Sequence, residues 1–144
     1  MQQQEGMSDN TPAVVLDTNL FIAAYWNKGS ASAEIVRACR EGRARLYFTQ
    51  QMRRELFHIL GNIRAHERYR QEVNDALDRG TEIAAPGTLR VVVEDPDDDK
   101  FLECARIASA DYLVTNDDHL LRIGEFERTK IVKPSEFRRI LHGL

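Results

Sequence analysis

The chain has 144 residues, of which 42% are hydrophobic and 30% are charged, and its formal net charge is −3. This length allows one folded domain with its own core, and no apolar run approaches the ~20 residues that span a bilayer, which excludes a membrane protein. The negative charge argues against a protein that holds nucleic acid mainly by bulk electrostatics, although a carboxylate metal site would itself add negative charge.

The polar N-terminus, residues 1–12, lacks the apolar segment of a signal peptide and is interpreted as a disordered leader. Residues 13–144 are then expected to form a single domain. The two cysteines, Cys39 and Cys104, show no metal-site spacing and are interpreted as buried free thiols of a reducing compartment. Together these features predict a cytoplasmic protein.

Short apolar runs alternate with helical patterns along the chain, which is typical of an α/β sheet. The first run, residues 13–16, has no polar alternation and predicts a buried strand. A helix is expected at 20–26. A second helix is expected at about 30–40, where Ser30 can cap its start and Gly42 can end it.

The middle of the chain continues this alternation. A second strand is predicted at 46–49, and apolar residues from 52 to 63 then recur at helical spacing. A more polar helix is expected at 67–77. Residues 81–88 contain a Pro-Gly pair and are interpreted as a turn region.

The last third of the chain holds three further predicted strands. Residues 89–93 are rich in β-branched side chains and predict the third strand, which ends at the acidic run 95–99. A helix begins within that run. Strands are also predicted at 112–114 and 131–132, and Pro134 is placed to begin a final helix.

Acidic side chains lie directly after the predicted strands. Asp17 follows the first strand, the run 95–99 follows the third, and Asp117 and Asp118 follow the fourth. Ligands of open parallel sheets bind beyond the carboxyl ends of the strands, and Mg²⁺ and Mn²⁺ prefer oxygen ligands. The sequence therefore predicts a metal pocket at this edge, although any one Asp at such a turn is as often only a helix cap.

Helical spacing distinguishes the members of the acidic run. Asp98 stands three and four residues before Phe101 and Leu102, so it is expected to share their buried face. Asp97 is expected to cap the helix, and Asp99 is expected on its solvated polar face.

Glu55 is the fourth candidate carboxylate. It lies on the helix after the second strand and borders the apolar face that includes Met52 and Leu56. Taken alone, it is more often a surface carboxylate near Arg54. Four carboxylates at one sheet edge would repel one another, and a bound divalent ion would resolve that conflict.

Four segments resemble, in order, the motifs of PIN domains. The resemblance extends from Val14 to about Leu141, and its nearest branch is the VapC-like toxin component of toxin–antitoxin pairs. The segments that carry it are Val14–Asn19, Thr49 followed by Glu55, Asp95–Leu102 and Leu113–Asp117.

This resemblance implies a three-layer α/β/α fold with a central, mainly parallel sheet, related to flap-type nucleases. It also implies a Mg²⁺- or Mn²⁺-dependent endoribonuclease that acts as a toxin. Asn19 and Thr115 match the family's supporting polar residues. The family's catalytic and metal-binding set falls on Asp17, Glu55, Asp98 and Asp117.

Several weaker assignments accompany this set. Asp118 is a further candidate ligand, and His119 is the one histidine near a motif. Arg53 and Arg54 precede Glu55 and are candidate phosphate contacts. The alternative that both are only solvated helix residues has at least equal weight, because charge alone does not identify a phosphate contact. The implied partners are an RNA substrate, an antitoxin protein and a second copy of the chain in a homodimer.

Two other functions remain open at this point. One is a PIN-like module that binds RNA or protein without catalysis, and the complete acidic set argues against it. The other is a phosphatase of the haloacid-dehalogenase type, which also begins with an Asp after a buried strand. That chemistry needs a second Asp two residues on, where this chain has Asn19.

Overall fold

The computed structural model describes residues 11–92 and 95–144. Most of the leader predicted at 1–12 therefore lies outside the described residues. The strands form one six-stranded sheet in the order β3-β2-β1-β4-β6-β5, in which only the β5–β6 pair is antiparallel. The strands are β1 (Ala13–Leu16), β2 (Arg45–Thr49), β3 (Thr81–Ile83), β4 (Tyr112–Val114), β5 (Glu125–Phe126) and β6 (Thr129–Val132).

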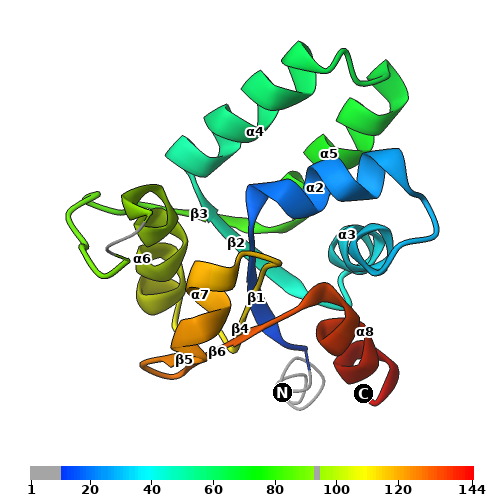
Figure 1. The fold of residues 1–144 in the computed structure, drawn as a ribbon. Coiled ribbons are helices and arrows are strands. Elements are labelled where there is room, and N and C mark those ends of the chain that lie inside the picture. The colour runs from blue at the N-terminus through cyan, green and yellow to red at the C-terminus, as the bar shows by residue number, and fades with distance from the viewer. Residues whose placement is uncertain (1–10, 93–94) are drawn as a thin grey trace, which may run out of the picture.

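Helices cover both faces of this sheet. Figure 1 shows α6 and α7 on one side and α3, α5 and α8 on the other, with α2 and α4 leaving the carboxyl ends of their strands. This arrangement confirms the three-layer α/β/α fold with a mainly parallel sheet. The helices are α2 (Thr18–Trp26), α3 (Ala31–Glu41), α4 (Gln50–Asn62), α5 (Glu67–Arg79), α6 (Asp99–Ala108), α7 (Asp118–Ile123) and α8 (Pro134–His142), and a 3₁₀ turn, η1 (Pro96–Asp98), precedes α6. Within the described ranges, none of these helices has the length and apolar character needed to cross a membrane.

The central strand β1 sets the position of the site. All four of its residues are buried, because β1 lies between β2 and β4 and under helices on both faces. Leu16 pairs with Val114 of β4 in parallel register. The residues that follow, Asp17 and Thr115, therefore leave the sheet side by side at the same edge.

Most local predictions of the sequence are confirmed. Ser30 caps α3 by accepting a hydrogen bond from the Ala33 N–H, and Gly42 ends that helix at φ +81°, a conformation that glycine adopts without a steric penalty. Pro134 begins α8, where its missing N–H costs nothing. These features depend on neighbours a few residues apart, which a sequence pattern shows directly.

The predicted third strand is wrong. Leu89–Val92 form no strand, and Val93, the end of the prediction, lies outside the described residues. The third strand is instead Thr81–Ile83, within the predicted turn region, where it pairs with β2. The N–H groups of Val91 and Val92 both donate to the Asp99 carboxylate, so a side chain takes the place of a strand partner.

The two cysteines occupy the protein interior. Cys39 on α3 and Cys104 on α6 are free and buried, as predicted. Burial raises the pKa of each thiol to about 12, because the thiolate anion is poorly solvated there.

Candidate metal centre

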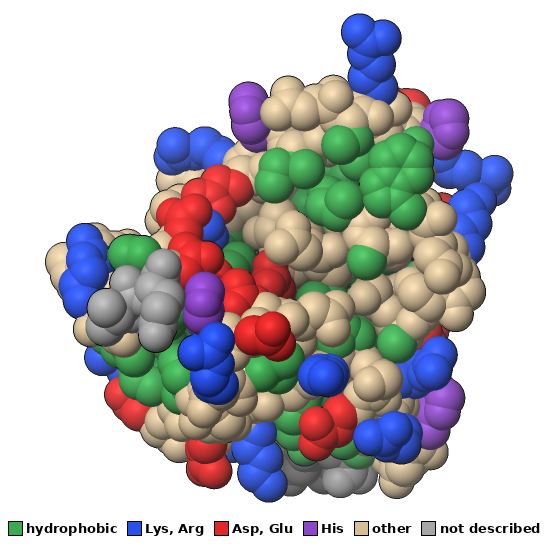
Figure 2. Space-filling view, in the orientation of Figure 1, with side chains coloured by type: hydrophobic (Ala, Val, Ile, Leu, Met, Phe, Trp, Pro, Cys, Tyr) green, Lys and Arg blue, Asp and Glu red, His purple; other side chains and the backbone are tan. Residues whose placement is uncertain are grey.

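A cleft of about 560 Å³ opens at the carboxyl edge of the sheet, between the start of α2, the helix α4 and the η1–α6 segment. Figure 2 shows its acidic side chains as a red group in a hollow of this face. The predicted residues that line the cleft include Asp17, Asn19, Arg54, Glu55, Asp98 and Asp117. The fold therefore brings the four predicted carboxylates to one cleft, which is the spatial arrangement that their strand-end positions predicted.

Asp17 is held rigidly at the floor of the cleft. Its side chain is 4% exposed and caps α2 by accepting the N–H of Asn19 at 3.0 Å. The Thr115 hydroxyl donates to its other oxygen at 2.7 Å. A buried carboxylate needs such donors, so both contacts fix where the Asp17 charge points. Asn19 supports Asp17 through its backbone.

Thr115 also positions Asp117. The Thr115 side chain is fully buried, and its hydroxyl oxygen accepts the backbone N–H of Asp117 at 2.9 Å. Asp117 in turn caps α7 by accepting the N–H of His119 at 2.7 Å. One hydroxyl thus links the two acids that follow β1 and β4.

Asp98 is the carboxylate that the protein itself leaves least satisfied. It is 6% exposed, in agreement with the buried face that helical spacing predicted. Its Oδ2 atom is buried and has no hydrogen-bond partner among the described residues. The Oδ2 atom of Asp99 shares this property, but the other oxygen of Asp99 accepts two backbone N–H groups. Burial, followed by the neighbouring carboxylates of Asp117, Asp95 and Asp17, raises the pKa of Asp98 to about 8.

The pKa of Asp117 is shifted in the opposite direction, below its usual value. Burial alone would raise its pKa, but hydrogen bonding with Asp98 and the N–H groups of His119 and Leu120 outweighs that effect and holds the pKa below its usual value. The negative charge of the pair is therefore favoured on Asp117 over Asp98.

Four side chains can hold a cation together. Asp95, Asp98, Asp117 and His119 each offer a ligand atom, and these atoms lie within 4.8 Å of one another. Carboxylate oxygens are the donors that Mg²⁺ and Mn²⁺ prefer, and the unpartnered Asp98 Oδ2 is a ready ligand atom. The residues present therefore fit a divalent ion. Asp17 and Glu55 stand outside this group of four.

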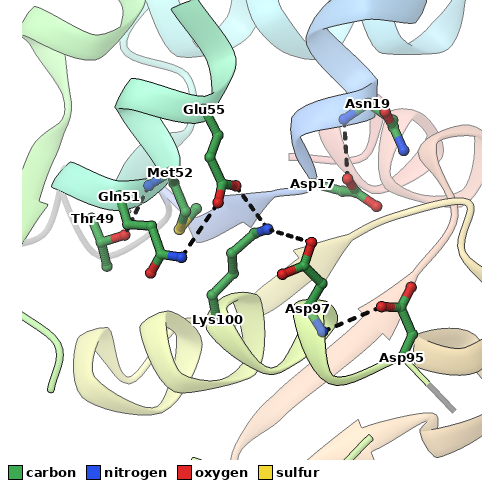
Figure 3. A network of polar contacts seen from close by, with 9 residues as sticks. All are labelled: Asp17, Asn19, Thr49, Gln51, Met52, Glu55, Asp95, Asp97 and Lys100. Atoms are coloured by element: carbon green, nitrogen blue, oxygen red, sulfur yellow. Dashed lines mark hydrogen bonds and ion pairs between the residues drawn. The ribbon is translucent and has the colours of Figure 1, made fainter. Parts of the chain in front are cut away.

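Glu55 meets a different partner, as Figure 3 shows. One of its oxygens lies 2.7 Å from Lys100 Nζ, and the other accepts a hydrogen bond from Gln51 Nε2 at 3.3 Å. Lys100 Nζ also lies 3.7 Å from an oxygen of Asp97. The cationic partner that a Glu at this position requires is thus Lys100.

Two expectations about the acidic run are wrong. Asp97 does not cap the helix: it is exposed, and its N–H donates to Asp95, which is the capping residue of η1. Asp99 is not solvated: it is 4% exposed and binds Val91 and Val92. The 3₁₀ turn moves the helix start past Asp97, and the segment that contains Val91 and Val92 covers Asp99.

The remaining predicted residues divide between the cleft and its surroundings. Arg54 lines the cleft, whereas Arg53 donates to Asn74 of α5 and lies outside the lining. Asp118 is exposed at the start of α7 and is also absent from the lining. Asp95 and Lys100 were not singled out from the sequence. Asp95 could have been found from its position before Pro96, but Lys100 depends on Glu55, a contact that no local pattern encodes.

The sequence comparisons agree with this geometry. A family model described as PIN domain matches residues 13–119, from the start of β1 into α7, which includes every acidic residue of the cleft. No curated protein matches the chain. PIN domains are generally nucleases and use divalent metals. This chain belongs to the PIN domain family.

Proposed function

We propose that this protein is an endoribonuclease that uses Mg²⁺ or Mn²⁺ to cleave RNA phosphodiesters. The observation that carries the proposal is the buried, unpartnered Oδ2 of Asp98 in a cluster of carboxylates, in a chain of a nuclease family. A cation would compensate the repulsion among these acids, which the protein's own side chains leave largely uncompensated.

The proposed roles follow from the contacts of each residue. Asp98 and Asp117 would hold the ion, with Asp17 as the third carboxylate at the floor of the cleft. A divalent ion, when bound, lowers the pKa of water and polarises a phosphate oxygen. Thr115 and the Asn19 backbone keep Asp17 in one orientation, which limits the rearrangement that binding requires.

Substrate contacts are proposed from the cleft lining. Arg54 lies in the cleft and would contact an RNA phosphate as a planar, permanently charged donor. Arg53 is directed to Asn74 and is not assigned this role.

The direct test compares Asp17→Asn with Asp78→Asn, a control on the exposed face of α5. Asp17→Asn is expected to keep its far-ultraviolet circular dichroism spectrum and to lose cleavage of a labelled single-stranded RNA in Mn²⁺. Asp78→Asn should cleave as the unchanged protein does. Equal cleavage in the presence of EDTA would contradict the proposed metal requirement. Binding of the RNA without cleavage would favour a catalytically silent binding module. A DNA strand of the same sequence tests the preference for RNA.

We also propose that the enzyme acts as a toxin on cytoplasmic RNA and forms a homodimer, as the VapC-like resemblance implies. Induced expression is expected to arrest growth, and Asp17→Asn is expected to relieve the arrest. Light scattering on the purified protein measures the mass of the assembly. A monomer at all concentrations would contradict the dimer.

A second pocket supports the proposal of an antitoxin partner. It has a volume of about 340 Å³ and lies between α2, α3 and α5. Four cations and one carboxylate line it: Lys28, Arg37, Arg40, Arg68 and Glu72. Two copies of this face would repel, so an acidic segment of another protein fits it better. Arg37→Glu with Arg40→Glu should prevent a co-expressed antitoxin from relieving growth arrest.

A further inference from the structure

The cleft contains two electrostatically different halves. One half is the group of Asp95, Asp98, Asp117 and His119, whose ligand atoms lie within 4.8 Å of one another. The other half is the ion pair of Glu55 and Lys100, with a distance of 2.7 Å between Oε1 and Nζ. Figure 3 shows Lys100 rising from α6 to reach Glu55 on α4 across the cleft. The protein therefore already supplies a cation to one half.

Helix stability does not account for the position of Lys100. It is the second residue of α6, and a cation in the first turn of a helix opposes the helix dipole. Its side chain is only 14% exposed, so its ammonium also loses much of its hydration. Glu55 and Asp97 offset these costs, and the ring of Phe101, 5.1 Å from Nζ, adds a weak attraction.

The same contacts make Glu55 a poor ligand for a second metal ion. One of its oxygens is paired with an ammonium, and the other already accepts from Gln51. A divalent ion at this carboxylate would lie next to the Lys100 charge and be repelled by it. The role of a second cation in two-metal nucleases is to stabilise the leaving oxygen of the phosphodiester.

We infer that Lys100 takes the place of a second metal ion in this cleft: the protein binds one divalent ion, and the Lys100 ammonium contacts the RNA phosphate on the Glu55 side. This inference rests on the proposed function. Lys100 acts as a fixed charge that Glu55 orients, and it transfers no proton. Glu55 is then a positioning residue and not a metal ligand.

Mn²⁺ stoichiometry tests the inference without reference to activity. Isothermal titration and electron paramagnetic resonance should show one Mn²⁺ per chain in the unchanged protein. In Lys100→Gln, Glu55 is released to join Asp97, and a second Mn²⁺ should bind, with the spin coupling expected of ions about 4 Å apart. Lys100→Arg keeps the charge and should bind one ion. The double variant Lys100→Gln with Glu55→Gln should return to one.

RNA cleavage gives the second measurement. Lys100→Gln is expected to cleave about 100-fold more slowly at low Mn²⁺, by analogy with the loss of one charge-stabilising group, and to recover in part as Mn²⁺ rises. If Lys100→Gln does not fold, Lys100→Met replaces it in both the Mn²⁺ titration and the cleavage assay.

The outcomes separate the two proposals. Two Mn²⁺ ions in the unchanged protein, or one ion in the folded Lys100→Gln or Lys100→Met variant, would overturn the inference about Lys100. Neither result would contradict the proposed nuclease function. No Mn²⁺ binding and no cleavage in the unchanged protein would overturn the proposed function itself.

Discussion

Two neighbouring aspartates, Asp98 and Asp99, have nearly the same burial and opposite surroundings. Asp98 is 6% exposed and Asp99 is 4% exposed. The Oδ2 atoms of both are buried without a partner among the described residues. Asp99 Oδ1 accepts the N–H groups of Val91 and Val92 at 2.9 and 2.8 Å, whereas the groups around Asp98 are mainly other carboxylates. Burial of an acid therefore does not identify a functional site; the groups that its oxygens meet do.

The contrast extends along the whole of α6. One turn beyond Asp99, the buried Glu103 accepts the N–H groups of Gly87 and Thr88. Asp99 and Glu103 thus attach the segment 84–92 to one side of α6. Asp98 and Lys100 line the cleft instead. The η1–α6 segment therefore carries structural acids, Asp99 and Glu103, beside the proposed functional residues Asp98 and Lys100, and variants can separate the two groups.

The largest effect is expected for Asp98→Asn. Loss of the ligand charge should reduce RNA cleavage by more than about 100-fold. Substitution of residues that only support metal ligands already lowers metal affinity or activity by about 10–100-fold. The folded state should persist, since the amide removes a buried, poorly compensated carboxylate. Cleavage kinetics and Mn²⁺ titration measure the loss. Near-normal cleavage would contradict the functional role proposed for Asp98.

Asp99→Ala is expected to act on stability alone. Two backbone N–H groups lose a charged acceptor, so the free energy of unfolding should fall by about 2–3 kcal/mol. Urea unfolding followed by circular dichroism measures it, with the exposed Asp78→Ala as the control. Mn²⁺ affinity of the folded protein should stay unchanged, and a fall in that affinity would place Asp99 in the metal centre.

Thr115→Val tests the residue that orients the two acids Asp17 and Asp117. The valine cannot donate to Asp17 or accept from the Asp117 N–H, so both acids lose a fixed orientation. Mn²⁺ affinity is expected to fall about 10-fold, which calorimetry measures. Thr115→Ser retains the hydroxyl and should retain most of the affinity. If the two variants bind equally, the hydroxyl does not position the ligands.

The last prediction concerns the pH dependence of the stability of the metal-free protein. Because the pKa of Asp98 is raised to about 8, the folded state binds a proton that the unfolded state has released above its ordinary pKa near 4. Stability should therefore fall as pH rises from about 5 to 8, because the folded state must release this proton in that range. The lowered pKa of Asp117 acts at lower pH and does not oppose this trend.

Urea unfolding at several pH values in EDTA measures this dependence, and Asp98→Asn should flatten it. Mn²⁺ should reverse the trend, because ion binding needs the deprotonated carboxylate. A stability that rises from pH 5 to 8 without metal would contradict the raised pKa.

Local signals explain which parts of the molecule could be predicted from the sequence. The apolar run of β1, the cap of α3 by Ser30 and the helical spacing that buries Asp98 each depend on residues a few positions apart. The strand-end positions of Asp17 and Asp117 then follow from the parallel sheet.

The errors have the opposite origin. The stretch 81–88 is predicted as a turn region because it contains Pro86 and Gly87, but Thr81–Ile83 becomes a short strand by pairing with β2. The β-branched residues at 89–93 suggest a strand, but Asp99 takes up the N–H groups of Val91 and Val92. Lys100 meets Glu55 only through the tertiary fold, so its role in the cleft has no local signature.

The two interior thiols make the protein convenient for spectroscopy. The thiolate is the form that reacts with alkylating labels, and a pKa of about 12 leaves Cys39 and Cys104 almost entirely protonated at neutral pH. A cysteine introduced at Asn116, which is exposed between β4 and α7, would therefore be the single reactive position. A nitroxide attached there lies beside the cleft and would report the distance to bound Mn²⁺ without removal of either native sulfur.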